Sequence, residues 1–389
     1  MNYRKFGKTG YDVSALGLGC MRLPRVFDAK TNDFGTEVDL EKAFEIIRYA
    51  ADHGITYFDT AFGYHGQKSE GILGEALEEN GRRKKVKIAT KQPINVMTDR
   101  AAIRRNLEDT LKKLRTDYID VYLMHNIQGG TWEKFQQVGA IEEFEKAKSE
   151  GLIKTIGFSF HGGYADFEKI INGYDGWEMA QVQHNLLDLT REATISGVEL
   201  AGKKGVALAI MEPLRGGGLA SAPKAVRELY DSYEEKRTPA EWAFKYLLDR
   251  PEVSVILSGM STLEQLKENI ALFGKADSVE NSLSDKERNI IAEAKKRYES
   301  IITIPCTKCY YCMPCPKGVS IPEIFGKYND AKMFESYDNP RRTYMFDTRF
   351  GHDASNCVEC GACEKKCPQK IEIIKNLKVA HEALKGWVE

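Results

Sequence analysis

The chain has 389 residues, of which 42% are hydrophobic and 29% are charged, and its formal net charge is -1. This length exceeds one average domain and fits a barrel of about 250 residues followed by a smaller unit. The near-zero charge excludes a general electrostatic attraction to nucleic acid or to anionic membranes, so small molecules or proteins are the expected partners.

The N-terminal stretch MNYRKFGKTGYDV has no apolar core of signal-peptide length. No later run approaches the roughly 18 apolar residues that a membrane helix needs, so we expect a cytoplasmic protein with no membrane partner. The residues RKFGKTGYDVS (4–14) are typical of a hairpin with a Gly-containing turn. We expect this hairpin to close the bottom of a barrel.

Short apolar runs alternate with amphipathic segments over the first two thirds of the chain, which indicates parallel strands joined by crossover helices. Leu40, Ala43, Phe44 and Ile47 recur at helical spacing and predict the first helix. Eight strands are expected, at 16–19, 56–59, 86–90, 118–124, 155–159, 179–183, 207–211 and 253–257. Further helices are expected at 69–80, 101–114, 132–150, 164–174, 194–204, 239–249 and 263–273.

Eight strands with intervening helices predict an α/β fold, a (β/α)8 TIM barrel. An open doubly wound sheet is the alternative, but it more often shows a Gly-x-Gly-x-x-Gly turn after its first strand.

Near residue 276 the alternation of strand-like and helix-like segments ends. Ser284 and Glu287 form a capping-box pattern that predicts a charged connecting helix to about Ser300, and 371–386 reads as a closing helix.

Ionisable residues follow three consecutive strands of the predicted barrel: Asp59, Lys91 and His125. Tyr64 lies five residues beyond Asp59, close enough to fold back over the same face. Active sites of such barrels lie at the C-terminal ends of the strands, so these four side chains are expected to meet. Each one alone is more often an ion pair or an ordinary loop residue, but four at successive strand ends favour a catalytic site.

The chemistry of this group follows from the pKa of a phenol, which is about 10. To protonate a carbonyl oxygen near pH 7, Tyr64 needs a cation beside it that stabilises the phenolate, and Lys91 can supply that charge. Asp59 would keep Lys91 protonated and oriented, and His125 could hydrogen-bond the carbonyl oxygen. A hydride donor is still missing from this set.

At these residues the sequence resembles the aldo-keto reductases, through FDTAFGYHGQKSEGILGEAL, KIATK and YLMH. The resemblance covers about residues 1–275 and implies Tyr64 as the general acid, supported by Asp59, Lys91 and His125. It also implies NAD(H) or NADP(H) as the cofactor. The residues implied to bind this cofactor are Ser159, Gln183, Asn185, Leu214, Gly216, Gln265, Glu268 and Asn269.

The cofactor-binding stretches depart from the family pattern in two places. Members that bind the 2′-phosphate of NADP usually carry a Lys and an Arg where this chain has Gly259 and Gln265, although Lys267 could substitute. The family commonly stacks a Tyr on the nicotinamide where this chain has Met211 and Glu212. The choice between NAD and NADP therefore stays open.

Eight of the nine cysteines lie near the C-terminus, in CTKCYYCMPCP (306–316) and CVECGACEKKCP (357–368), at the spacing of metal ligands in a reducing compartment. Cys20 stands apart and is expected to be an ordinary buried thiol. The second run fits the bacterial ferredoxin pattern, and the first is one residue shorter. Two [4Fe-4S] clusters are expected, one on Cys306, Cys309, Cys312 and Cys367 and one on Cys357, Cys360, Cys363 and Cys315.

Two alternatives to this cluster assignment remain. Paired C-x-x-C motifs can bind zinc, although zinc ribbons seldom place cysteines in unbroken three-residue steps followed by Pro. The shortened first run and the long segment between Cys315 and Cys357 also allow a single cluster, on Cys357, Cys360, Cys363 and one distant cysteine.

The whole chain thus resembles a subgroup of aldo-keto reductases that carry a ferredoxin-type extension. We expect a reductase barrel at 1–275, a helical connector at 276–303 and a small ferredoxin-like α+β iron-sulfur domain at 304–389. The expected function is NAD(P)H-linked interconversion of a small carbonyl and an alcohol, with clusters for structure or for electron exchange with a ferredoxin or flavoprotein. The alternative is an electron-transfer protein whose barrel is a docking or redox-sensing scaffold.

Overall fold

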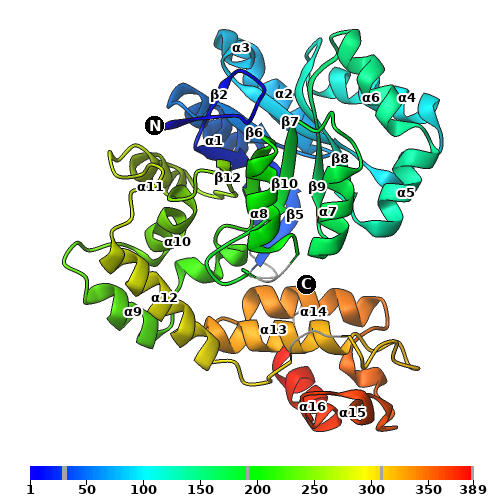
Figure 1. Ribbon diagram of the computed structural model, residues 1–389, viewed down its shortest axis with the longest axis vertical. Helices are drawn as coiled ribbons and strands as arrows, with labels where there is room; N and C mark the ends of the chain where they lie inside the picture. Colours follow the sequence, from blue (N-terminus) through cyan, green and yellow to red (C-terminus); the bar gives the residue numbers. More distant parts are fainter. Residues whose placement is uncertain (29–32, 190–191, 307–309, 387–389) are drawn as a thin grey trace. The chain divides into compact units, whose positions relative to one another are not determined.

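The computed structural model describes residues 1–28, 33–189, 192–306 and 310–386. The chain forms two compact units. The first contains Met1–Pro213 and Ala243–Leu283, and the second contains Leu214–Trp242 and Ser284–Glu389. Figure 1 follows the chain through both units from the N-terminus to the C-terminus.

The first unit is built on a closed barrel of eight parallel strands, in the order β10-β11-β12-β3-β6-β7-β8-β9. This confirms the predicted (β/α)8 architecture. Each expected strand is present within a few residues of its predicted position. The barrel strands are β3 (Leu16–Gly19), β6 (Tyr57–Asp59), β7 (Lys87–Gln92), β8 (Ile119–Ile127), β9 (Ile153–Phe160), β10 (Met179–Gln183), β11 (Ala207–Met211) and β12 (Val253–Ser258).

Helices between the barrel strands surround the barrel, as α5, α6 and α7 do beside β8 and β9 in Figure 1, and they bury apolar side chains such as Phe144 and Phe167. The predicted helix at 132–150 is two helices instead, because Gly139 adopts a left-handed conformation (φ 70°) that ends the first and precedes the second. These helices are α1 (Leu40–Asp52), α2 (Ser69–Glu78), α3 (Arg82–Lys85), α4 (Arg100–Lys113), α5 (Gly129–Gln137), α6 (Ala140–Ser149), α7 (Tyr164–Asn172), α8 (Thr194–Lys203), α10 (Pro239–Leu248, whose first residues belong to the second unit) and α11 (Leu263–Phe273).

The N-terminal hairpin pairs β1 (Tyr3–Lys5) with β2 (Asp12–Ser14) and is confirmed as predicted. Phe6 and Val13 of this hairpin are fully buried in one cluster with inward-facing barrel residues such as Tyr57. The hairpin therefore fills one end of the barrel interior. A second antiparallel pair joins β4 (Arg25–Asp28) and β5 (Asp33–Val38).

The described residues of the second unit form helices joined by irregular segments and contain no strand, so the C-terminal domain differs from the α+β arrangement expected. The reason is visible in the sequence between the cysteine runs, where Ile321, Ile324, Phe325 and Tyr328 recur at helical spacing and are buried together. The capping box at Ser284 and Glu287 is confirmed. The helices are α9 (Lys224–Asp231), α12 (Asp285–Ser300), α13 (Ile321–Met333), α14 (Asp338–Arg349), α15 (Ala362–Lys366) and α16 (Ile373–Leu384).

The segment Leu214–Trp242 follows a barrel strand in the sequence but belongs to the second unit. Arg215 donates a hydrogen bond to Asp330 of α13 at 2.8 Å, and its guanidinium lies 5.7 Å from the ring centre of Phe334. Arg237 forms an ion pair with Glu287 of α12. The boundaries predicted at 275 and 303 stay predictions.

In the described residues, no helix combines the length and apolarity needed to cross a bilayer.

We predict that Phe6→Ala lowers the free energy of unfolding of the barrel by about 3 kcal/mol, because a fully buried aromatic ring is lost and a cavity remains. Lys5→Ala is the matched control, since this neighbouring side chain is exposed and its ion pair with Asp12 is at the surface. Urea unfolding followed by circular dichroism measures both. Equal midpoints for the two variants would show that Phe6 does not support the barrel.

Candidate functional site

Asp59, Lys91 and His125 lie at the C-terminal ends of three adjacent barrel strands, β6, β7 and β8. Lys91 pairs in register with Leu123 of β8. The register between β8 and β9 shifts between Met124 and Ile127, next to His125, and His125 lies close enough to Lys91 for the lysine charge to lower its pKa. The barrel thus brings these side chains to one rim, as the sequence predicted.

Lys91 is the centre of this group and is 1% exposed. Its Nζ donates to both carboxylate oxygens of Asp59, at 2.8 and 2.9 Å, and to the carbonyl oxygen of Thr60 at 2.7 Å. It also lies 3.3 Å from the hydroxyl oxygen of Tyr64. The buried ammonium is therefore fully paired, and one of its partners is the phenol.

The loop that carries Tyr64 is held at both ends by hydrogen bonds. The Thr60 hydroxyl donates to the Ser69 hydroxyl at 2.8 Å, and the Tyr64 N–H donates to the Ala61 carbonyl at 3.1 Å. His65 contacts the carbonyl oxygen of Cys20 through Nε2, at 3.0 Å. Tyr64 is therefore fixed beside Lys91 by the backbone of its own loop.

Burial controls the protonation of these groups. Burial acts to lower the pKa of Lys91, but the Asp59 carboxylate and Tyr64 outweigh it and raise that pKa, so the amine stays charged. Burial raises the pKa of Tyr64, and the Lys91 ammonium opposes this rise. Burial and the Lys91 charge together lower the pKa of His125 to about 3, so the imidazole is neutral at pH 7.

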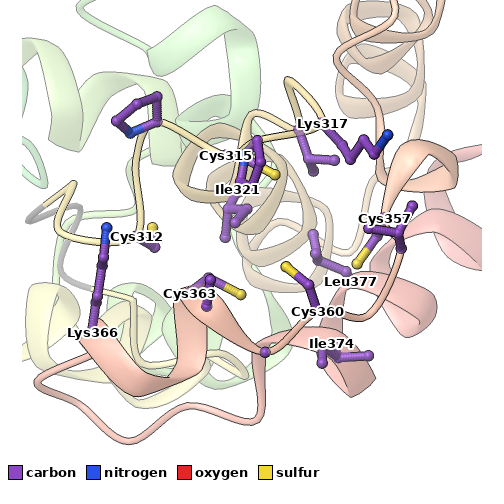
Figure 2. A pocket seen from close by; sticks show the side chains of 16 residues that line it. Cys312, Cys315, Lys317, Ile321, Cys357, Cys360, Cys363, Lys366, Ile374 and Leu377 are labelled. Atoms are coloured by element: carbon purple, nitrogen blue, oxygen red, sulfur yellow. The ribbon is translucent and has the colours of Figure 1, made fainter.

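A second feature, in the C-terminal helical region, is a cavity of about 310 Å³ lined by cysteines. Figure 2 shows Cys315, Cys357, Cys360 and Cys363 around this space, with Cys312 at its edge. The apolar residues Ile321, Ile374 and Leu377 line it as well. Four thiols around one apolar cavity are the donor set that holds an iron-sulfur cluster.

A smaller cavity nearby is lined by Cys306, Cys312 and Cys367, together with apolar residues such as Phe325 and Ile371. Cys315, Cys357, Cys360 and Cys363 line only the larger of these two cavities, Cys306 and Cys367 line only the smaller one, and Cys312 lines both, so the assignment of ligands to two clusters stays a prediction. Cys309 lies outside the described residues. Among those that are described, no three His, Cys, Asp or Glu side chains lie close enough to hold a single ion.

Comparison with known proteins identifies the barrel. The model of the aldo/keto reductase family matches residues 15–295, which is more than half of the chain. The chain belongs to the aldo-keto reductase family. An uncharacterized oxidoreductase of Bacillus subtilis is 31% identical to this reductase over 312 residues, covering 69% of this chain and 90% of the relative. A probable aldo-keto reductase of Glycine max is 27% identical over 325 residues, 75% of this chain and 88% of that protein.

Solved structures agree with this assignment. The holo form of an aldo-keto reductase from Bacillus halodurans superimposes with a TM-score of 0.60 at 26% identity, covering 76% of this chain and 96% of that one. The fold is also shared with an aldo-keto reductase from Klebsiella pneumoniae in complex with NADPH, at 22% identity and a TM-score of 0.60, over 75% and 95% of the two chains. A 4Fe-4S dicluster domain model matches residues 305–372. The reductase is therefore an oxidoreductase with an iron-sulfur domain.

Ser159 and Gln183, two expected cofactor residues of this reductase, lie at the ends of β9 and β10. The Ser159 hydroxyl accepts the Asn126 N–H at 2.8 Å, and within the described residues it donates to no acceptor. Gln183 donates to Asp188 at 3.2 Å. Both side chains retain polar groups that a nicotinamide carboxamide could use.

Asn185 differs from Ser159 and Gln183, because all the hydrogen-bonding capacity of its side chain is taken up within the protein. Its amide nitrogen donates to Asp188 at 2.9 Å and to the Glu212 carbonyl at 3.1 Å. Its oxygen accepts the N–H groups of Leu187 and Asp188, both at 3.0 Å. Four hydrogen bonds are the capacity of an amide side chain, so Asn185 shapes the loop after β10.

The expected adenosine residues lie on α11. Gln265 accepts the Ser261 N–H at 3.0 Å, Glu268 is exposed, and the buried Asn269 donates to the Ser258 hydroxyl at 3.2 Å. Leu214 and Gly216 belong to the second unit, where the Leu214 carbonyl accepts the Gly217 N–H at 3.0 Å. Gly216 has a φ of 67°, the left-handed conformation that suits glycine there.

Two features around Asp59 and Lys91 were not predicted from the sequence. Gln181 of β10 acts to lower the pKa of the Asp59 carboxyl against the effect of burial, and the Thr60 carbonyl accepts from Lys91. Gln181 could have been found, because it is two residues from Gln183 and so points to the same face of its strand. Nothing in the sequence marks a backbone carbonyl such as that of Thr60.

We predict that His125 makes the reductase less stable in mild acid. Its folded pKa of about 3 lies below the value near 6.5 of an unfolded histidine, so the unfolded chain takes up the proton first. The stability gained by keeping this imidazole neutral is complete above pH 7 and is lost as the pH falls below about 6.5.

His125→Gln should therefore reduce the loss of unfolding free energy between pH 7.5 and 5.5 by about 1 kcal/mol. Urea unfolding at both pH values measures this difference. His53→Gln, at an exposed histidine, is the control and should retain the wild-type pH dependence. If His125→Gln also retained it, the imidazole would not be held neutral by burial.

Proposed function

We propose that the protein is an NAD(P)H-linked oxidoreductase that interconverts a small carbonyl compound and an alcohol. The observation that carries this proposal is the buried Lys91 ammonium, which joins the Asp59 carboxylate to the Tyr64 hydroxyl. A phenol that contacts a charged amine releases its proton more easily than one in an apolar site. Such a phenol is a suitable proton donor to a carbonyl oxygen.

In the direction of reduction, the Tyr64 hydroxyl gives its proton to the substrate oxygen, and Lys91 stabilises the phenolate that remains. Asp59 neutralises the charge of Lys91 in the buried site, so the amine keeps its position. The neutral His125 can donate an N–H to the same substrate oxygen and set its orientation. The reverse sequence serves the oxidation of an alcohol.

NAD(P)H, when bound, supplies the hydride for the carbonyl carbon. We propose that Ser159 and Gln183 hold the nicotinamide amide, because each retains hydrogen-bonding capacity, and that Asn185 positions their loop. Leu214 and Gly216 are proposed to meet the diphosphate, and Gln265, Glu268 and Asn269 the adenosine. The NADPH complex of the Klebsiella pneumoniae protein supports this cofactor class. Titration of the protein with each nucleotide distinguishes NAD from NADP.

For the cysteine domain we propose two [4Fe-4S] clusters, with Cys315, Cys357, Cys360 and Cys363 holding the one in the larger cavity. Cys306, Cys309, Cys312 and Cys367 are proposed to hold the other. The division of the described thiols between two cavities and the match to a dicluster domain support this arrangement. Because a cluster moves one electron at a time, a ferredoxin or flavoprotein is the proposed electron partner.

We predict that Tyr64→Phe lowers kcat/KM for carbonyl reduction at least about a hundredfold, because the proton donor is lost. Tyr57→Phe is the matched control. It removes the hydroxyl of a fully buried barrel tyrosine whose oxygen has no hydrogen-bond partner among the described residues. Absorbance at 340 nm, with NADH or NADPH and a panel of aldehydes under anaerobic conditions, measures the rates. Full activity in Tyr64→Phe would exclude the proposed proton donor.

We predict that the anaerobically purified protein holds roughly eight iron atoms per chain and that Cys363→Ala holds about four, because one cluster loses a ligand. Cys20→Ala, at a buried thiol in the barrel, should keep the full iron content. Colorimetric iron analysis and electron paramagnetic resonance of the reduced protein make the measurement. Zinc in place of iron, or equal iron in both variants, would contradict the assignment.

A further inference from the structure

The surface around the larger cysteine cavity has a distinct chemical character. Lys317 and Lys366 both line the cavity, and Figure 2 shows them on opposite sides of it. Val358 and Cys360 line it as well and are exposed, Val358 at 57%. We name these four exposed residues, Lys317, Val358, Cys360 and Lys366, the cysteine face.

The charge of the cysteine face comes from lysines that no carboxylate neutralises. Within the part of the chain that the structure describes, neither Lys317 nor Lys366 forms an ion pair, and the neighbouring Lys365 forms none either. The acids next in sequence to these residues have other partners. Glu359 pairs with Lys378 at 2.6 Å, and Glu364 accepts the Ile374 N–H at 2.9 Å.

Cys360 is the other important feature, because a proposed cluster ligand is exposed at the centre of this face. A cluster that served only to hold the fold together would gain nothing from an exposed ligand. A cluster that exchanges electrons with another protein needs one edge near the surface. Val358 beside Cys360 adds an apolar contact of the kind found at the centre of protein interfaces.

We propose that the cysteine face is the docking site of a small, acidic electron-carrier protein. This inference rests on the proposed function, since it requires a cluster in the cavity behind the face. In the transfer, the reduced carrier loses one electron and the cluster gains one, so no proton or further reactant is needed. Lysines on either side of an apolar centre match a carrier whose redox centre is surrounded by carboxylates.

Such a contact is expected to be weak and fast. Electron-transfer complexes bury little surface and depend on long-range attraction, so their affinity falls steeply with salt. The two lysines should therefore contribute mainly to the association rate and to the charge selectivity of the face. Neither lysine is part of the proposed proton-donor group, so carbonyl reduction should not depend on them.

The test is a binding titration of the anaerobically purified full chain with an oxidised acidic plant-type [2Fe-2S] ferredoxin as the probe. Isothermal titration calorimetry at low ionic strength measures Kd without any turnover. We expect the double variant K317E/K366E to raise Kd at least tenfold, and K317Q/K366Q to raise it by a smaller factor. Both differences should shrink as sodium chloride is added.

The matched control is K224E/K296E, which makes the same change in net charge at exposed lysines of α9 and α12. It should keep the wild-type Kd. An equal Kd for K317E/K366E and this control, with wild-type iron content in both, would overturn the docking site. So would equally tight binding of a basic cytochrome c. A wild-type protein without iron would instead overturn the proposed clusters, which separates the two failures.

Discussion

The reductase barrel depends on one buried ion pair, between Lys91 and Asp59. Two charges inside a protein are costly unless each is fully paired, and here three acceptors, the Asp59 carboxylate, the Thr60 carbonyl and the Tyr64 hydroxyl, satisfy the ammonium. The same requirement fixes the loop after β6, since Thr60 and Tyr64 both lie on it. The contacts that satisfy the Lys91 ammonium are thus the same contacts that position the Tyr64 phenol.

Much of the barrel could be predicted from the sequence, because each strand is a short apolar run and the ionisable residues follow three of them directly. Where the prediction of the site stopped, the cause was long-range contact. Gln181, on a strand far along the chain, influences the Asp59 carboxyl, and the amide nitrogen of Asn185 donates to the Glu212 carbonyl 27 residues away. Side-chain type shows which hydrogen bonds a residue can make, but only the fold shows which of them are already made.

In the cysteine domain, the candidate ligands were easier to predict from the sequence than the secondary structure was. The spacing of the cysteines identifies the candidate ligands, because ligand spacing is a local property, and six of the described cysteines each line only one of the two cavities. The closing helix predicted at 371–386 is present as α16, but α13 was not predicted, although Ile321, Ile324, Phe325 and Tyr328 show the helical period. The expectation of strands came from resemblance to compact ferredoxins, and the long segment between the two runs folds here as α13 and α14 instead.

The segment Leu214–Trp242 gives the molecule a property that neither half would have alone. In the sequence it lies between the barrel strands β11 and β12, yet its Arg215 and Gly218 pack against Asp330 and Phe334 near the C-terminus. A chain ending at Leu283 would keep all eight barrel strands and leave this segment without the helices it packs on. Cutting the chain after Leu283 is therefore expected to expose the buried side chains of this segment, such as Val226 and Tyr230 of α9, to solvent.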